Sequence, residues 1–150
     1  MDNELIVFLP LALSSLVTML WAPNWDEGRI KSRFQPPGYV FGVVWTIIYI
    51  LFGVFLNRLR KTKSKYFYPL VLAAVLNLMI CTSWPVVVRV YKQNIIGLYM
   101  IFMLIFTLLC MLCMLENDTQ SKLLLVPYLT WCFVAVLLQT EVIRLEKASL

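Results

Sequence analysis

The chain alternates long apolar stretches with short clusters of charge. Five stretches contain no charged residue: 5–24, 34–57, 66–88, 93–115 and 123–140. Each spans about 18–24 residues, the length that a helix rising 1.5 Å per residue needs to cross a ~30 Å hydrocarbon layer. A charge at the centre of a membrane helix costs about 2.5–3.5 kcal/mol, so five uncharged stretches indicate five spanning helices.

We therefore predict an all-α membrane protein, a five-transmembrane-helix bundle that forms a single domain over residues 1–150. The expected helices cover about residues 5–22, 39–58, 66–89, 94–115 and 122–144. The first stretch follows the acidic sequence M-D-N-E, whereas a signal peptide begins with basic residues, so we keep it as a spanning helix.

Composition supports the membrane prediction. Hydrophobic residues make up 61% of the chain and charged residues 14%, against roughly 45–50% and 25% in a soluble domain. A soluble chain of this size would expose large apolar patches and aggregate. The net charge of +5 comes from Lys and Arg in the connecting segments, which suits contact with lipid headgroups. We expect membrane lipid as a partner and no nucleic acid.

The side chains that usually carry catalysis or bind metals are scarce. There is no histidine, which excludes a His-based triad and a proximal haem histidine. The four cysteines lie within apolar stretches, where buried free thiols are expected. Cys110 and Cys113 form a C-x-x-C without a second pair, which is weak support for a metal or redox site. We predict no metal site.

One connecting segment is long for such a compact protein. Residues 22–38 combine prolines, glycines, charges and the aromatic residues Trp25 and Phe34. Loops of this length are usually functional or disordered, and the aromatic residues favour a folded segment. We predict a capping loop between the first and second helices, with Pro36-Pro37 starting the second.

Aromatic and amide side chains within the spans are the candidate site. Trp45 is followed by Tyr49 at i+4, and Trp131 follows Tyr128 at i+3, so each pair shares a helix face. These tryptophans either line an internal pocket or pack in the core. Asn77 is costly in a membrane unless it is paired, so it makes either a helix–helix hydrogen bond or a ligand contact. The prolines within the third and fifth stretches either kink a helix for packing or open a cavity.

Three motifs resemble the TspO/MBR family, the translocator or peripheral-type benzodiazepine receptor-like proteins. The first runs Trp25-x-x-Gly28-x-x-Lys31-x-Arg33-Phe34-Gln35-Pro36-Pro37-Gly38-Tyr39-Val40-Phe41-Gly42-Val43-Val44-Trp45, then Tyr49. The second is Asn77 followed by Trp84-Pro85, and the third is Pro127-Tyr128-Leu129-x-Trp131 with Ala135. Together they cover nearly the whole chain in the order that the family has.

The resemblance implies a pocket under the first loop that binds hydrophobic ligands. Those ligands are porphyrins (protoporphyrin IX and haem-related tetrapyrroles), benzodiazepine-type drugs and sterols, with a porphyrin as ligand and no cofactor. The candidate ligand-binding residues are Phe34, Pro36, Pro37, Tyr39, Trp45, Tyr49, Asn77, Trp84, Trp131, Ala135 and Leu138. Trp45 and Trp131 become the catalytic candidates if the protein degrades porphyrin in light.

This sequence departs from the family pattern in three places. Cys81 stands where the family usually has Asn, and the fourth stretch is apolar around Met100, where many relatives have Asp. In the proposed sterol motif over residues 138–144, Thr140 replaces the aromatic residue.

Several functions and locations stay open from the sequence. We expect a receptor- or transporter-like binding protein rather than an enzyme. The alternatives are light-dependent porphyrin degradation, sterol binding, and an oligomeric scaffold such as a homodimer. The membrane would be the mitochondrial outer membrane if the chain comes from a mitochondriate eukaryote.

Overall fold

The computed structural model describes residues 4–23, 30–61 and 64–149, and these are entirely without strands. The elements are the 3-10 helix η1 (Glu4–Phe8) and the α-helices α1 (Leu9–Trp21), α2 (Gly38–Lys61), α3 (Phe67–Arg89), α4 (Asn94–Met114) and α5 (Thr119–Ala148). Within these described ranges, five helical spans, the first made of η1 and α1 together, are long and apolar enough to cross a membrane. The predicted fold class is confirmed.

Local sequence explains where the helices begin and turn. Pro10 lies in the first turn of α1, where its missing N–H would have no partner within the helix. Pro37 directly precedes α2, and its carbonyl accepts from the Val40 N–H at 2.9 Å. Lys92 and Glu116 have positive φ angles of 52° and 38° in the tight turns that precede α4 and α5.

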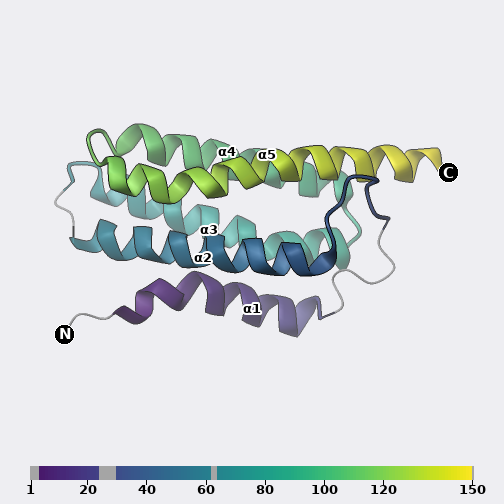
Figure 1. Ribbon diagram of the computed structural model, residues 1–150, viewed down its shortest axis with the longest axis horizontal. Coiled ribbons are helices and arrows are strands. Elements are labelled where there is room, and N and C mark those ends of the chain that lie inside the picture. Colours follow the sequence, from purple (N-terminus) through teal and green to yellow (C-terminus); the bar gives the residue numbers. More distant parts are fainter. Residues whose placement is uncertain (1–3, 24–29, 62–63, 150) are drawn as a thin grey trace.

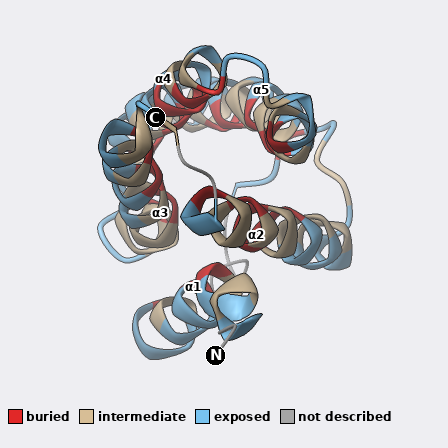
Figure 2. Cartoon of the chain, turned by 90° about the vertical axis from the view of Figure 1, so that its left-hand side faces the viewer, coloured by how far each residue is buried: buried red, intermediate tan, exposed pale blue. Residues whose placement is uncertain are grey.

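The five helices form a closed ring. Going around it, α1 contacts α2, α2 contacts α5, α5 contacts α4, α4 contacts α3, and α3 returns to α1. In Figure 2, α1 lies at one side of the bundle, next to α2 and α3 and away from α4 and α5. The start of η1 and the end of α5 lie at opposite ends (Figure 1), as five crossings require.

The outer surface of the bundle is apolar. Large hydrophobic side chains point outward from every helix, among them Leu16, Ile47, Leu72, Phe106 and Leu137. Figure 2 shows the buried residues on the inner faces of the helices and the exposed ones outside. Because such a surface is stable only against lipid tails, the chain is an integral, multi-pass membrane protein.

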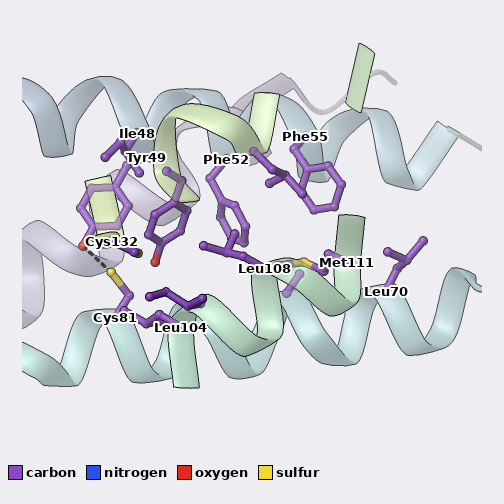
Figure 3. Close-up of a cluster of buried hydrophobic side chains, with 14 of the residues drawn as sticks. Ile48, Tyr49, Phe52, Phe55, Leu70, Cys81, Leu104, Leu108, Met111 and Cys132 are labelled. Atoms are coloured by element: carbon purple, nitrogen blue, oxygen red, sulfur yellow. Dashed lines mark hydrogen bonds between the residues drawn. The ribbon is translucent and has the colours of Figure 1, made fainter. Parts of the chain in front are cut away.

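The interior of the bundle differs along its length. Towards the C-terminal end of α2 it is filled by a cluster that includes Phe52, Phe55, Leu70, Leu108 and Met111 (Figure 3). The rings of Phe52 and Phe55 lie 5.7 Å apart, centroid to centroid. Towards the N-terminal end of α2, where the long first loop enters, the interior is hollow. The filled half fixes the helices around the hollow half.

The last helix is longer than predicted. It runs over Thr119–Ala148 rather than 122–144, because polar contacts stabilise both of its ends. At the start, Asp118 accepts from the Ser121 N–H at 3.0 Å. Near the other end, Glu146 accepts from Asn94 Nδ2 at 3.0 Å, and this hydrogen bond ties the last turns to α4.

Replacing Asp118 by alanine is expected to destabilise the start of α5. Its carboxylate caps the helix, accepts from the Ser121 hydroxyl at 2.6 Å and pairs with Arg58 at 3.3 Å. Loss of a helix cap costs about 0.5–2 kcal/mol. Thermal unfolding in detergent at neutral pH measures the effect. Asp118→Asn, which keeps an acceptor oxygen but loses the charge, is expected to lose less stability.

The same contacts make the contribution of Asp118 to the stability of α5 dependent on pH. The hydrogen bond from the Ser121 hydroxyl, aided by Arg58, lowers the pKa of Asp118 below its ordinary value. The stabilisation is therefore complete above that ordinary pKa and is lost as the pH falls through the lowered one. The difference in stability between wild type and Asp118→Ala should shrink in acid. A difference independent of pH would contradict this account.

Candidate functional site

A cavity of about 450 Å³ occupies the hollow half of the bundle. All five helices contribute to its wall, and no charged side chain is among the described residues that line it. The lining residues are Leu11, Ser14, Ser15, Thr18, Met19, Pro23, Phe41, Gly42, Trp45, Thr46, Tyr49, Cys81, Trp84, Pro85, Ile101, Leu104, Trp131, Cys132 and Ala135. Such a wall suits a largely apolar ligand.

Aromatic rings shape the cavity and hold one another in place. Trp45 stacks on Tyr49 with ring centroids 5.5 Å apart and an interplanar angle of 28°. On the other side, Phe41 meets the edge of Trp131 at 5.5 Å and 72°. The Trp84 indole N–H donates to the Gly97 carbonyl at 3.0 Å. The ring positions are therefore set before any ligand arrives.

A short polar chain lies along one side of this cavity. The Ser14 hydroxyl donates to the Tyr49 oxygen at 2.8 Å. Tyr49 Oη and Cys81 Sγ are 3.3 Å apart and form a second hydrogen bond, drawn as a dashed line in Figure 3. The Tyr128 hydroxyl is within reach of the same sulfur but makes no well-formed hydrogen bond with the described residues. Pro85 lies one turn after Cys81 in α3. Because proline has no backbone N–H, Pro85 cannot donate the usual helical hydrogen bond to the Cys81 carbonyl.

The most exposed part of the cavity wall that lies within helices belongs to α1 and α2. Ser15 and Met19 of α1 and Gly42 and Thr46 of α2 both line it and are exposed on the outer surface. The lining residues of α3, α4 and α5 are buried or only partly exposed. Lipid therefore lies closest to the cavity on the side of α1 and α2.

The structure brings five of the predicted ligand-binding residues together in this cavity. They are Trp45, Tyr49, Trp84, Trp131 and Ala135. They come from α2, α3 and α5, and the folding of the ring is what makes them neighbours. Pro85, expected either to kink its helix or to open a cavity, lines the same cavity, whereas Pro127 does not.

Other predicted residues lie outside the cavity wall. Phe34 and Tyr39 are 83% and 74% exposed, and neither side chain lines the cavity. Pro36 and Pro37 lead into α2, and Leu138 lies one turn beyond the lining residues of α5. The expected cap is described only over residues 22–23 and 30–37, at the end of the bundle where α1 ends (Figure 1). Trp25 and Gly28 of the family motif lie outside the described residues.

Asn77 joins two helices. Its amide nitrogen donates to Thr107 Oγ1 at 2.8 Å and to the Leu104 carbonyl at 3.3 Å, and the side chain is fully buried between α3 and α4. Of the two roles left open by the sequence, the structure gives the helix–helix contact. Asn77 is not part of the cavity wall.

The sequence prediction missed the contribution of the first helix. Leu11, Ser14, Ser15 and Thr18 line the cavity, although that helix was expected only to span the membrane. A signal was available, because residues 11, 14 and 18 recur at helical spacing on one face and two of them are hydroxyl residues. Cys132 and Phe41 were also missed, since neither differs from an ordinary core residue in sequence.

Comparison with known proteins agrees with this architecture. The pattern of the TspO/MBR family matches residues 5–145. The chain is 32% identical to the tryptophan-rich protein TspO of Chlorobaculum tepidum, over 93% of this chain and 84% of that one. It is 27% identical to the protein of the same name from Archaeoglobus fulgidus, over 81% and 79% of the two chains. The tryptophan-rich sensory protein of Cereibacter sphaeroides is also 27% identical, over 85% and 80%. The chain belongs to the TspO/MBR family.

Proposed function

We propose that this protein binds a flat, hydrophobic tetrapyrrole such as protoporphyrin IX in the cavity between its helices. The observation that carries the proposal is the aromatic wall made by Phe41, Trp45, Tyr49, Trp84 and Trp131 around a volume of about 450 Å³. This volume is typical of small-molecule sites, which span about 300–1,000 Å³. A planar macrocycle gains stacking and burial on such rings.

The exposed lining residues of α1 and α2 support a receptor or transport role. We expect a ligand dissolved in the bilayer to enter the cavity on this side without crossing the headgroup layer. Benzodiazepine-type drugs are also flat, and we expect them to compete for the same rings. Sterol binding has less support, because the side chain at the motif position, Thr140, is exposed and donates to the Val136 carbonyl at 2.7 Å.

Titration with protoporphyrin IX tests the proposal. Tryptophan fluorescence of the detergent-purified protein is expected to be quenched as the ligand enters. Changing Trp45 and Trp131 together to phenylalanine should weaken binding about tenfold, because aromatic pairs contribute about 0.5–1.5 kcal/mol each beyond burial. Trp21→Phe, at the exposed end of α1, is the control that should leave affinity unchanged. An unchanged affinity in the double variant would overturn the assignment.

A second candidate function is light-dependent degradation of the bound porphyrin. Trp45 and Trp131 line the same cavity, so both indoles lie near any ring bound there. The stacking of Trp45 on Tyr49 also places a second oxidisable ring beside the first. Illumination of the complex should then bleach the porphyrin absorption faster than illumination of free porphyrin in detergent. Equal rates would exclude this activity.

A further inference from the structure

We infer that Cys81 is the axial ligand for the iron of a ferric haem, so that the cavity binds an iron tetrapyrrole in preference to a metal-free one. This inference rests on the proposed tetrapyrrole binding and adds to it the class of ligand and the atom that recognises it. Three features carry it: the donors available in the cavity, the hydrogen bonds at this sulfur, and the number of protein donors that the metal needs.

Few side chains in the cavity can bind iron. The chain has no histidine, and no carboxylate is among the described residues of the cavity wall. What remains are the thiols of Cys81 and Cys132, the Met19 thioether, the Tyr49 phenol and a few aliphatic hydroxyls. Cysteine thiolate, methionine thioether and tyrosine phenolate are all established axial haem ligands. Met19, however, is 75% exposed, and the Tyr49 oxygen is already hydrogen-bonded to both Ser14 and Cys81. The two cysteine sulfurs are therefore the strongest candidates.

The hydrogen bonds distinguish Cys81 from Cys132. The Tyr49 oxygen accepts from Ser14, so its own proton is free to be donated to Cys81 Sγ, 3.3 Å away. A donor aimed at a sulfur stabilises its anionic form and tunes the metal bound to it. The buried Tyr128 hydroxyl lies near the same sulfur and lacks a well-formed hydrogen bond, so it is a second potential donor. No hydrogen bond reaches Cys132 Sγ among the described residues.

One sulfur is enough for a metal that a macrocycle already holds. No group of three His, Cys, Asp or Glu able to hold a bare ion is found among the described residues. Iron in a porphyrin, in contrast, has four ring nitrogens as ligands and takes only one or two more. The cavity therefore selects a metal carried inside a flat ring.

The binding step is a ligand exchange without oxidation or reduction. Ferric haem arrives with hydroxide or water on the iron. The Cys81 thiol gives its proton to that hydroxide, or to solvent if water is bound. The resulting water leaves, and a sulfur electron pair forms the Fe–S bond. The positive charge of the ferric porphyrin takes the place of the proton, so the thiolate is not left as an isolated charge in the membrane.

The test compares hemin with metal-free protoporphyrin IX on wild type, Cys81→Ser, Cys132→Ser and Cys113→Ser in detergent. The wild-type hemin complex should show the absorption, electron paramagnetic resonance and Fe–S Raman signatures of thiolate ligation. Cys81→Ser should abolish them and weaken hemin binding about tenfold more than it weakens protoporphyrin IX binding, and an equal loss for both rings would contradict iron ligation. Cys113 is exposed on α4, outside the cavity, so Cys113→Ser should match wild type.

Tyr49→Phe provides a second readout that does not depend on losing the ligand. Without the phenol donor, the sulfur should bind iron more strongly, and the Fe–S stretching frequency should rise while thiolate ligation persists. Thiolate signatures that survive Cys81→Ser, or that disappear in Cys132→Ser instead, would overturn the assignment. If protoporphyrin IX binds but hemin shows no thiolate, this inference fails alone. If neither ring binds to the wild-type protein, the proposed function fails as well.

Discussion

Replacing Gly53 by alanine is expected to separate the N-terminal segment from the rest of the bundle. A Cβ atom at this position would lie 1.8 Å from the Val7 carbonyl oxygen and 2.5 Å from its carbonyl carbon. Both are backbone atoms of η1, so no side chain can rotate to make room. Overpacking usually costs about 1–3 kcal/mol, and we expect the upper end of that range or more because the backbone itself must move.

The consequences of Gly53→Ala extend to the cavity. Gly53 is the point where η1 packs directly on α2, and α1 continues from η1 into the cavity wall with Leu11 and Ser14. Close approach of two helices at a small residue is a common way to pack them in a membrane, where the hydrophobic effect contributes little. If η1 moves away, these lining residues move with it. Ligand affinity should therefore fall together with stability.

Gly42→Ala is the matched control for this substitution. It lies in the same helix, and a Cβ atom there would meet nothing within 4 Å. Since alanine is favoured over glycine inside a helix by about 1 kcal/mol, Gly42→Ala should be neutral or stabilising. Thermal unfolding followed by circular dichroism in detergent compares the two variants. Equal stability of both would contradict the close contact at Gly53.

The five spans were predictable because lipid imposes a simple requirement. A segment that crosses the bilayer must be apolar and about 20 residues long, and both properties are read directly from sequence. The helix ends were less predictable. The start of α5 depends on Asp118 as a cap, and its final turns depend on the contact between Glu146 and Asn94. These are polar contacts outside the apolar stretch.

The candidate site was predictable only in part. Trp45 and Tyr49 stood out because aromatic residues four apart share a helix face. The contribution of α1 to the same cavity depends on how closely that helix approaches α2 at Gly53, which spacing within one helix does not reveal. Asn77 was ambiguous for the same reason, since its partner Thr107 lies on another helix. Which faces meet is decided by packing between helices.

Replacing Ala135 by phenylalanine is expected to abolish tetrapyrrole binding while leaving the fold intact. Ala135 is the smallest side chain that α5 contributes to the cavity, and it lies one turn after Trp131. A phenyl ring at this position would occupy the space that the ligand needs. We expect affinity for protoporphyrin IX to fall about a hundredfold, equivalent to about 2.8 kcal/mol.

The thermal stability of Ala135→Phe should not fall with its affinity. Empty apolar volume destabilises a protein by about 24 cal/mol per Å³, so a ring that partly fills the cavity should raise the unfolding temperature or leave it unchanged. Leu137→Phe, on the same helix but 72% exposed to the exterior, adds a ring on the lipid side and should preserve binding. Fluorescence titration and thermal unfolding of the two variants measure both effects. If Ala135→Phe still binds protoporphyrin IX with wild-type affinity, the ligand lies elsewhere.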